Sequence, residues 1–344
     1  MNIQTQERYL RDPLFDYFFI AFIPILAIAS AYFVVLFPQH FDTVLLLDIT
    51  LLGYHHVIST YTRIACSTRR LVEYKFLIVY LPPIVLVTVI GLALIESVWL
   101  ISTVYLHWQW WHYLRQSEGV AKSIRFKGKS VESGNERFNR MMFYLVPAIC
   151  FLMMSSRQPE MYLFMPVYTL PIPVNVANSL AIVTFILWCA WFVMQIKALL
   201  SRSLSPTHFL YLLSHYTIYL VAYVLISNVT YGWLAINIWH NLQYIIFVWH
   251  FNANTFKQGV DKKQPFISWI SQPRWFLFYF GACLILTEFL YGALNLGISL
   301  ITPYTLLPVT MIAYMTLNFH HYVVDSYIWK IRKPAIRKAI GIEA

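Results

Sequence analysis

Apolar stretches long enough to cross a membrane recur from one end of this chain to the other, and they restrict its fold more than any other feature. A transmembrane helix needs about 20 mostly apolar residues. The chain is 59% hydrophobic and 12% charged, whereas soluble domains are about 25% charged. We therefore expect an all-α integral membrane protein, a polytopic bundle of about ten transmembrane helices that forms one domain over residues 1–344. The expected spans are residues 16–37, 43–65, 76–95, 97–116, 138–156, 177–200, 207–228, 231–252, 274–298 and 304–330.

The basic residues test this span count, because cytoplasmic loops of membrane proteins collect Lys and Arg. With the N-terminus in the cytoplasm, all 25 Lys and Arg residues except Arg157 fall on the cytoplasmic side. One missed helix would scramble this distribution, so we expect both termini to be cytoplasmic. The net charge of +10 thus follows membrane topology, and no nucleic-acid partner is expected. The first apolar run is long enough to remain as a span, so we expect no cleavable signal peptide.

Several common chemistries have no support in the sequence. The four cysteines are scattered and form no CxxC pair, which argues against a disulfide framework or a zinc ribbon. There is no Gly-rich phosphate loop and no GxSxG motif, so nucleotide-driven and serine-hydrolase chemistry are not indicated. The cysteines are Cys66, Cys150, Cys189 and Cys283.

The histidines are the main functional signal. His40 lies in a short outer loop, and the other ten of the eleven histidines lie in expected spans. The orientation above places those ten in the cytoplasmic half of the membrane, with His240 nearest the midplane. Ionisable side chains inside a membrane are costly and usually mark function, so a shared depth indicates a metal site. The candidate ligands are His55, His56, His107, His112, His240, His320, His321 and Asp325.

Helical spacing indicates which residues act together, because residues three or four apart share a face. His321 and Asp325 form such a pair, and imidazole with carboxylate suits iron. The adjacent pairs leave open which histidine is the ligand. Other polar residues are expected to support the ligands, although His208, His215 and His250 are also candidates for hydrogen bonds between helices. The supporting candidates are Gln109, Gln116, His208, His215, Gln243, Tyr244, His250 and Glu288.

Four histidine-containing stretches resemble, in the same order, those of the Brp/Blh-type integral-membrane dioxygenases, which cleave β-carotene to retinal. The stretches are LGYHHVIST, YLHWQWWH, NIWHNLQY and NFHHYVVDSYIWK. The resemblance implies the following ligands: His56, or His55 in the alternative register, with His107, His240, His320 and Asp325. The HxxxH and HxxHH boxes of membrane desaturases and hydroxylases do not occur in the sequence.

The preferred hypothesis is a membrane-embedded non-haem iron oxygenase with one or two iron ions. It would use O2 on a lipophilic substrate that enters from the lipid bilayer through a mostly apolar passage, with an electron donor as a further candidate partner. A haem-binding membrane redox protein is the first alternative, because paired histidines ligate haem. A proton-coupled transporter is the second, although no inverted repeat is visible. We expect a multi-pass protein of a bacterial inner (plasma) membrane, with its site in the cytoplasmic half.

Overall fold

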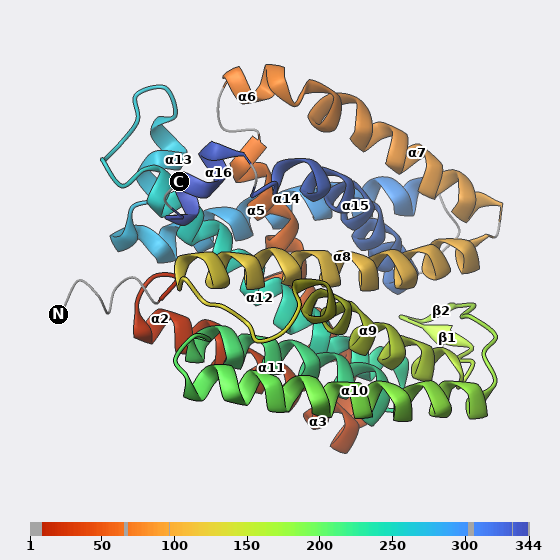
Figure 1. Ribbon diagram of the computed structural model, residues 1–344. Helices are drawn as coiled ribbons and strands as arrows, with labels where there is room; N and C mark the ends of the chain where they lie inside the picture. Colours follow the sequence, from red (N-terminus) through yellow and green to blue (C-terminus); the bar gives the residue numbers. More distant parts are fainter. Residues whose placement is uncertain (1–8, 65–67, 96, 302–305, 332, 343–344) are drawn as a thin grey trace.

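A computed structural model describes residues 9–64, 68–95, 97–301, 306–331 and 333–342 (Figure 1). About 81% of the chain is helical and strands are almost absent, so the prediction of an all-α chain is confirmed. The end of the expected span 43–65, the start of the span 304–330, and Cys66 lie outside the described residues.

All ten expected spans coincide with helical segments, several of which contain single π-helical turns (η). In the first half of the chain these are α2 (Pro13–Tyr17), η1 (Phe18–Phe22), α3 (Ile23–Leu36), η2 (Pro38–His40), α4 (Phe41–Asp48), η3 (Ile49–Gly53), α5 (Tyr54–Ile64), α6 (Thr68–Glu73), η4 (Phe76–Tyr80), α7 (Leu81–Leu94), α8 (Val98–Lys127) and α9 (Glu136–Ser155), η2 being a 3₁₀ turn. In the second half they are α10 (Val174–Leu200), α11 (Pro206–Leu220), η5 (Val221–Leu225), α12 (Val229–Thr255), α13 (Pro265–Ile270), the 3₁₀ turn η6 (Pro273–Trp275), α14 (Phe276–Ile301), α15 (Leu306–Ile328) and α16 (Pro334–Ile340).

Seven helical segments of the described chain are long and apolar enough to cross a bilayer, which makes this a membrane protein. Their outer faces carry large apolar side chains that only lipid would cover: Leu277 and Phe289 on α14 are each 80% exposed, and Phe185 on α10 is 63% exposed. The seven segments are Pro13–Leu36, Pro38–Ile64, Phe76–Leu94, Glu136–Ser155, Val174–Leu200, Pro206–Leu225 and Pro273–Leu300.

The three remaining expected spans correspond to α8, α12 and α15, and these helices are less apolar than the other seven. They lie inside the bundle: α12 packs against α3, α5 and η5, and α15 packs against α5, α7, α8 and α14. A helix surrounded by other helices meets little lipid, so its polar side chains are satisfied by protein partners. The lower apolarity of α8, α12 and α15 therefore marks the interior of the bundle, where the candidate ligands lie.

The two ends of the bundle differ. The helices α2, α13 and α16 lie at one end (Figure 1), and the short hairpin of β1 (Met161–Tyr162) and β2 (Met165–Pro166) lies at the other. Arg157, the one basic residue expected on the outer side, donates hydrogen bonds to the carbonyls of Tyr223 and Ile226 at the end of η5. Those carbonyls have no partner within the helix, so Arg157 has a structural role at this end.

Candidate metal centre

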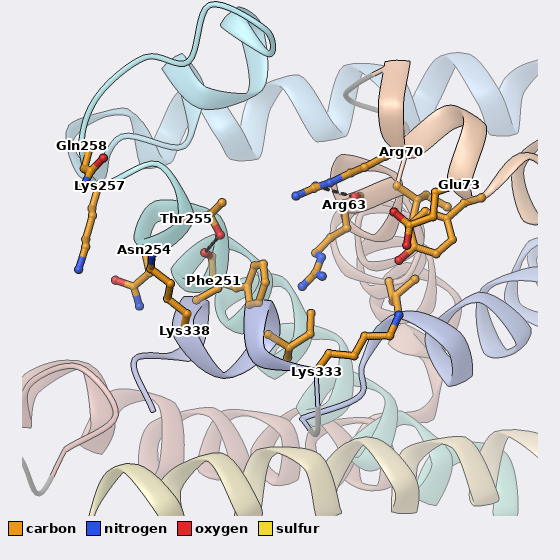
Figure 2. A pocket seen from close by; sticks show the side chains of 15 residues that line it. Arg63, Arg70, Glu73, Phe251, Asn254, Thr255, Lys257, Gln258, Lys333 and Lys338 are labelled. Carbon is orange, nitrogen blue, oxygen red and sulfur yellow. Dashed lines mark hydrogen bonds between the residues drawn. The ribbon is translucent and has the colours of Figure 1, made fainter. Parts of the chain in front are cut away.

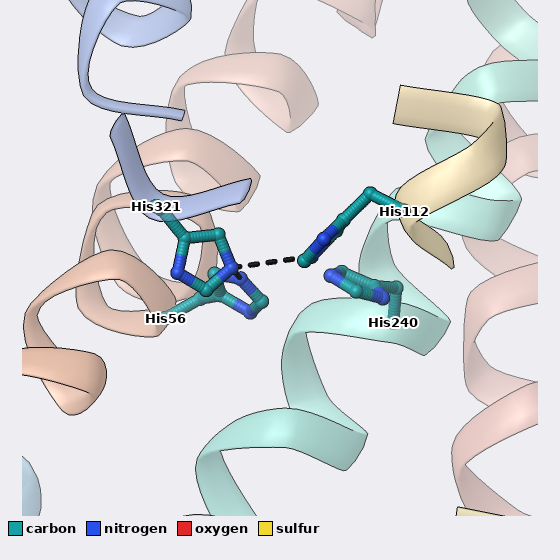
Figure 3. Close-up of side chains that lie close together, drawn as sticks. All are labelled: His56, His112, His240 and His321. Carbon is teal, nitrogen blue, oxygen red and sulfur yellow. Dashed lines mark hydrogen bonds between the residues drawn. The ribbon is translucent and has the colours of Figure 1, made fainter. Parts of the chain in front are cut away.

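Four histidines from four helices meet inside the bundle (Figure 3). They are His56 on α5, His112 on α8, His240 on α12 and His321 on α15, and one ring nitrogen of each lies within 4.8 Å of the corresponding nitrogen of the others. The Nε2 atom of His321 is 2.6 Å from Nε2 of His56 and 3.2 Å from Nε2 of His112. All four side chains are buried, with at most 7% of their surface exposed.

The donor set fits one metal ion. Ligand atoms that bind one ion at about 2.0–2.2 Å lie at most about 4.4 Å apart, which is close to the observed spread. Both ring nitrogens of His240 and Nδ1 of His56 are buried without a hydrogen-bond partner among the described residues. An unsatisfied buried polar atom is costly, and coordination of an ion by the group would remove that cost for the nitrogens facing it.

A hydrogen-bond network holds His321 in place. The Oγ1 atom of Thr60 is 2.8 Å from Nδ1 of His321, so Nε2 is the nitrogen that faces the other three histidines. Thr60 also lies 2.7 Å from the hydroxyl of Tyr244, which donates a hydrogen bond of 2.8 Å to Oδ1 of Asp325 and accepts one from Nε1 of Trp329. Such partners orient ligands and raise metal affinity.

Removing the Thr60 hydroxyl is therefore expected to weaken metal binding without removing a ligand. In Thr60→Val the side chain keeps its shape but loses the contact with Nδ1 of His321, and we expect metal affinity to fall about 10- to 100-fold. Competition with a chelator of graded strength measures this change. Thr62→Val is the matched control, because the Thr62 hydroxyl donates to the carbonyl of Ser59 and is not bonded to any of the four histidines. Equal losses in both variants would contradict a role for Thr60 at the site.

Asp325 borders the histidine group but does not belong to it. Its Oδ2 atom lies 3.5 Å from Nε2 of His321, as the i,i+4 spacing predicted. Its other oxygen accepts the hydrogen bond from Tyr244, and the set of nitrogens that converge does not include this carboxylate. Asp325 is thus placed beside the ligands, with one oxygen facing them.

Aromatic rings and amides position the other two histidines. Tyr322 stacks on His112 with ring centroids 4.3 Å apart, and Tyr113 packs on His240 at 4.0 Å. Gln109 donates a hydrogen bond of 2.5 Å to the Tyr113 hydroxyl, so it acts on His240 through that ring. Gln116, another candidate from the sequence, donates to the backbone carbonyl of His240 at 3.3 Å.

Three histidines proposed as ligands lie outside the group. His55 packs against Phe280, with ring centroids 4.3 Å apart. Nδ1 of His107 is bonded to the carbonyl of Thr103, one turn back on α8. Both nitrogens of His320 are engaged elsewhere, Nδ1 with the Tyr61 hydroxyl at 3.0 Å and Nε2 with the carbonyl of Leu77 at 2.6 Å. Neighbouring residues on a helix point about 100° apart, so only one member of each adjacent pair faces the centre.

Most of the remaining supporting candidates act between helices. His208 bonds Ser130, and His215 bonds Ser117 and the carbonyl of Phe143. The other three show no printed contact with the four histidines: Gln243 donates to the carbonyl of Phe19, His250 contacts Asn254, and Glu288 is exposed on α14.

Sequence reasoning missed Thr60, Tyr113 and Tyr322. Thr60 follows His56 by four residues, so the i,i+4 rule that paired His321 with Asp325 would have found it. Tyr113 and Tyr322 directly follow His112 and His321, and their rings reach neighbouring histidines only because the four helices converge. No local sequence pattern signals that convergence.

A cavity of about 680 Å³ lies between α8, α12 and α15 and reaches the metal centre. His112 and Asp325 form part of its wall, together with the aromatic side chains of Trp108, Trp111 and Tyr322. A pocket of this volume accommodates a small-molecule ligand. The cavity therefore provides a space beside the ligands in which a substrate would fit.

Charged residues also line this cavity, which differs from the mostly apolar passage expected. Lys330 and the cluster around Glu118 contribute to the wall. Glu118 is buried and accepts hydrogen bonds from Arg115, Tyr144 and Lys122, the last at 2.9 Å. The difference arises because α8 continues to Lys127, well past the expected end of its span at residue 116, and brings polar turns to the cavity.

No protein-family model, no curated protein and no solved structure matches this chain.

Proposed function

We propose that this chain is a membrane-embedded enzyme that holds one non-haem iron ion through His56, His112, His240 and His321. In this proposal it uses O2 to oxidise or cleave a lipophilic substrate. The observation that carries the proposal is the convergence of four buried imidazoles from four separate helices. Imidazole ligands suit iron, copper and zinc, and the adjacent carboxylate of Asp325 together with the resemblance to membrane dioxygenases favours iron.

The spacing of the nitrogens favours a single ion over the alternatives. A haem bound by two of these histidines would need its porphyrin between them, and Nε2 atoms 2.6 and 3.2 Å apart leave no space for that ring. Within the part of the chain that the structure describes, no second cluster of ligand-type side chains accompanies the four histidines. Both facts support one non-haem ion.

The residues around the ion suggest how the site would work. Iron would supply the redox chemistry with O2. Asp325 faces both the cavity and His321, so it is placed to accept a proton beside the ligands, and Tyr244 holds its carboxylate in position. The rings of Trp108, Trp111 and Tyr322 would bind the apolar part of a substrate and exclude water. The charged part of the cavity wall supports a lipophilic substrate with a polar end.

Metal analysis with an absorption spectrum of the purified protein tests this proposal. We expect about one iron per chain and no Soret band, because the geometry provides for one non-haem ion. A Soret band would instead favour the haem-binding redox alternative. Purified protein that binds neither iron nor another transition metal would contradict the proposal and favour proton-coupled transport.

We also propose ten spans with both termini in the cytoplasm, as in a bacterial inner membrane protein, which places the metal centre in the cytoplasmic half. The distribution of basic residues supports this, since only Arg157 falls on the outer side. Reporter fusions in residues 128–135, 201–205 and 256–264 should therefore report cytoplasm, and a fusion in residues 157–173 should report the other side. The opposite signal from any one of these fusions would show that the span count is wrong.

A further inference from the structure

A second cavity, of about 450 Å³, lies away from the four histidines, at the end of the bundle that carries α13 and α16 (Figure 2). We call it the basic pocket. Five basic side chains line it and one acidic side chain, Glu73, accompanies them. The basic side chains are those of Arg63, Arg70, Lys257, Lys333 and Lys338.

Arg63 is the most informative residue of the basic pocket. Its side chain is only 6% exposed, and its guanidinium carbon lies 3.7 Å from the ring centroid of Phe251 and 4.1 Å from that of Trp329. Its Nε and Nη1 atoms are buried without a hydrogen-bond partner among the described residues. Buried charges are normally paired and hydrogen-bonded, so this guanidinium indicates an absent anionic partner.

The surroundings of Arg63 provide the rest of an anion site. Nη1 of Arg70 donates a hydrogen bond of 2.7 Å to the backbone carbonyl of Arg63, which places the two arginines on the same side of the cavity. Figure 2 shows Arg63 pointing toward Phe251, with Lys333 beyond it and Lys257 and Lys338 across the cavity. The cations thus surround one space instead of projecting separately into solvent.

The number and type of these groups identify the ligand class. The planar guanidinium matches phosphate and carboxylate oxygens through parallel hydrogen bonds, and lysines add point charges. Five cations against one carboxylate exceed what a single carboxylate ligand would balance, whereas a phosphate group carries about 1.5 to 2 negative charges. Apolar side chains, among them Ile64, Ile328 and Ile336, also line the cavity and would contact the rest of a ligand.

We propose that the basic pocket binds the phosphate group of a small molecule or of a phospholipid headgroup. This site is separate from the metal centre and does not depend on the proposed oxygenase activity. It is nevertheless connected to that centre through α5, because Arg63 follows Thr60 by three residues and lies one helical turn from it.

Binding measurements on the full chain in phosphatidylcholine nanodiscs test this proposal. Inorganic pyrophosphate, titrated by calorimetry, is the soluble probe; phosphatidic acid added to the nanodiscs, with bound lipid counted by native mass spectrometry, is the lipid probe. The pocket variant combines Lys257→Gln with Lys338→Gln, because both lysines are exposed and their loss leaves the packing intact. The matched control combines Lys262→Gln with Lys263→Gln, which removes the same charge from exposed residues of the same loop region that do not line the pocket.

We expect the pocket variant to bind the effective probe at least about tenfold more weakly, because each lysine contributes a charged hydrogen bond. The control should retain wild-type binding. Pyrophosphate binding with this pattern identifies a soluble phosphate compound as the ligand, and binding of phosphatidic acid alone identifies a lipid headgroup. The proposal is overturned if neither probe binds the wild-type protein, or if the control loses as much binding as the pocket variant.

Discussion

Replacing His321 by Ala is expected to remove nearly all bound metal from the protein. His321 is the only one of the four histidines with hydrogen-bond contacts to two of the others, and its Nδ1 atom is held by Thr60. Losing one ligand of four leaves an open, weaker site, and we expect affinity to fall more than the 10- to 100-fold typical for loss of a supporting hydrogen bond. Metal content per chain in the purified, monodisperse protein measures the loss.

The neighbouring residue provides the matched control. His320→Ala removes a buried imidazole from the same turn of α15, but the nitrogens it removes are bonded to Tyr61 and Leu77, not to the metal centre. This variant should lose stability and retain its metal. Asp325→Asn should also keep most of the metal, because Asp325 lies beside the converging nitrogens. If His321→Ala retains wild-type metal content, or His320→Ala loses as much, the four histidines are not the metal site.

The choice within each histidine pair could not be made from the sequence, and the reason is geometric. The helices that carry the ligands lie inside the bundle, so both members of a pair are buried: His55 and His56 are 0% and 1% exposed, and His320 and His321 are 1% and 0% exposed. An inner helix has no polar face to indicate its orientation. The resemblance to membrane dioxygenases pointed to His107 and His320, whereas the residues that converge on those two helices are His112 and His321.

The helical segments themselves were predictable, because length and apolarity decide where a chain can cross a membrane. What the sequence did not predict is where the helices continue beyond a span and which of them lie inside. The polar turns of α8 beyond residue 116 read as a loop, but Glu118 is buried there by the basic side chains of Arg115 and Lys122. That pairing depends on the helical spacing of three and four residues, and it changes the lining of the cavity beside the metal centre.

A second large effect is expected from a single methyl group on α12, the helix that carries His240. A Cβ atom built on Gly232 would lie 2.0 Å from the backbone carbonyl oxygen of Ala222 in η5. A backbone atom cannot rotate away as a side chain can, so Gly232→Ala must push α12 and η5 apart. Overpacking of this kind costs about 1–3 kcal/mol and occasionally more, and a clash with the backbone places this variant at the upper end of that range.

Gly232→Ala is therefore expected to lower the thermal unfolding midpoint of the detergent-solubilised protein by about 5 °C or more. It should also weaken metal binding, because displacing the start of α12 shifts His240 relative to the other three histidines. Gly281→Ala on α14 is the control: no atom in the described part of the chain lies within 4 Å of its added Cβ, and alanine is the better helix former. An unchanged midpoint and unchanged metal content in Gly232→Ala would show that α12 and η5 do not pack this closely.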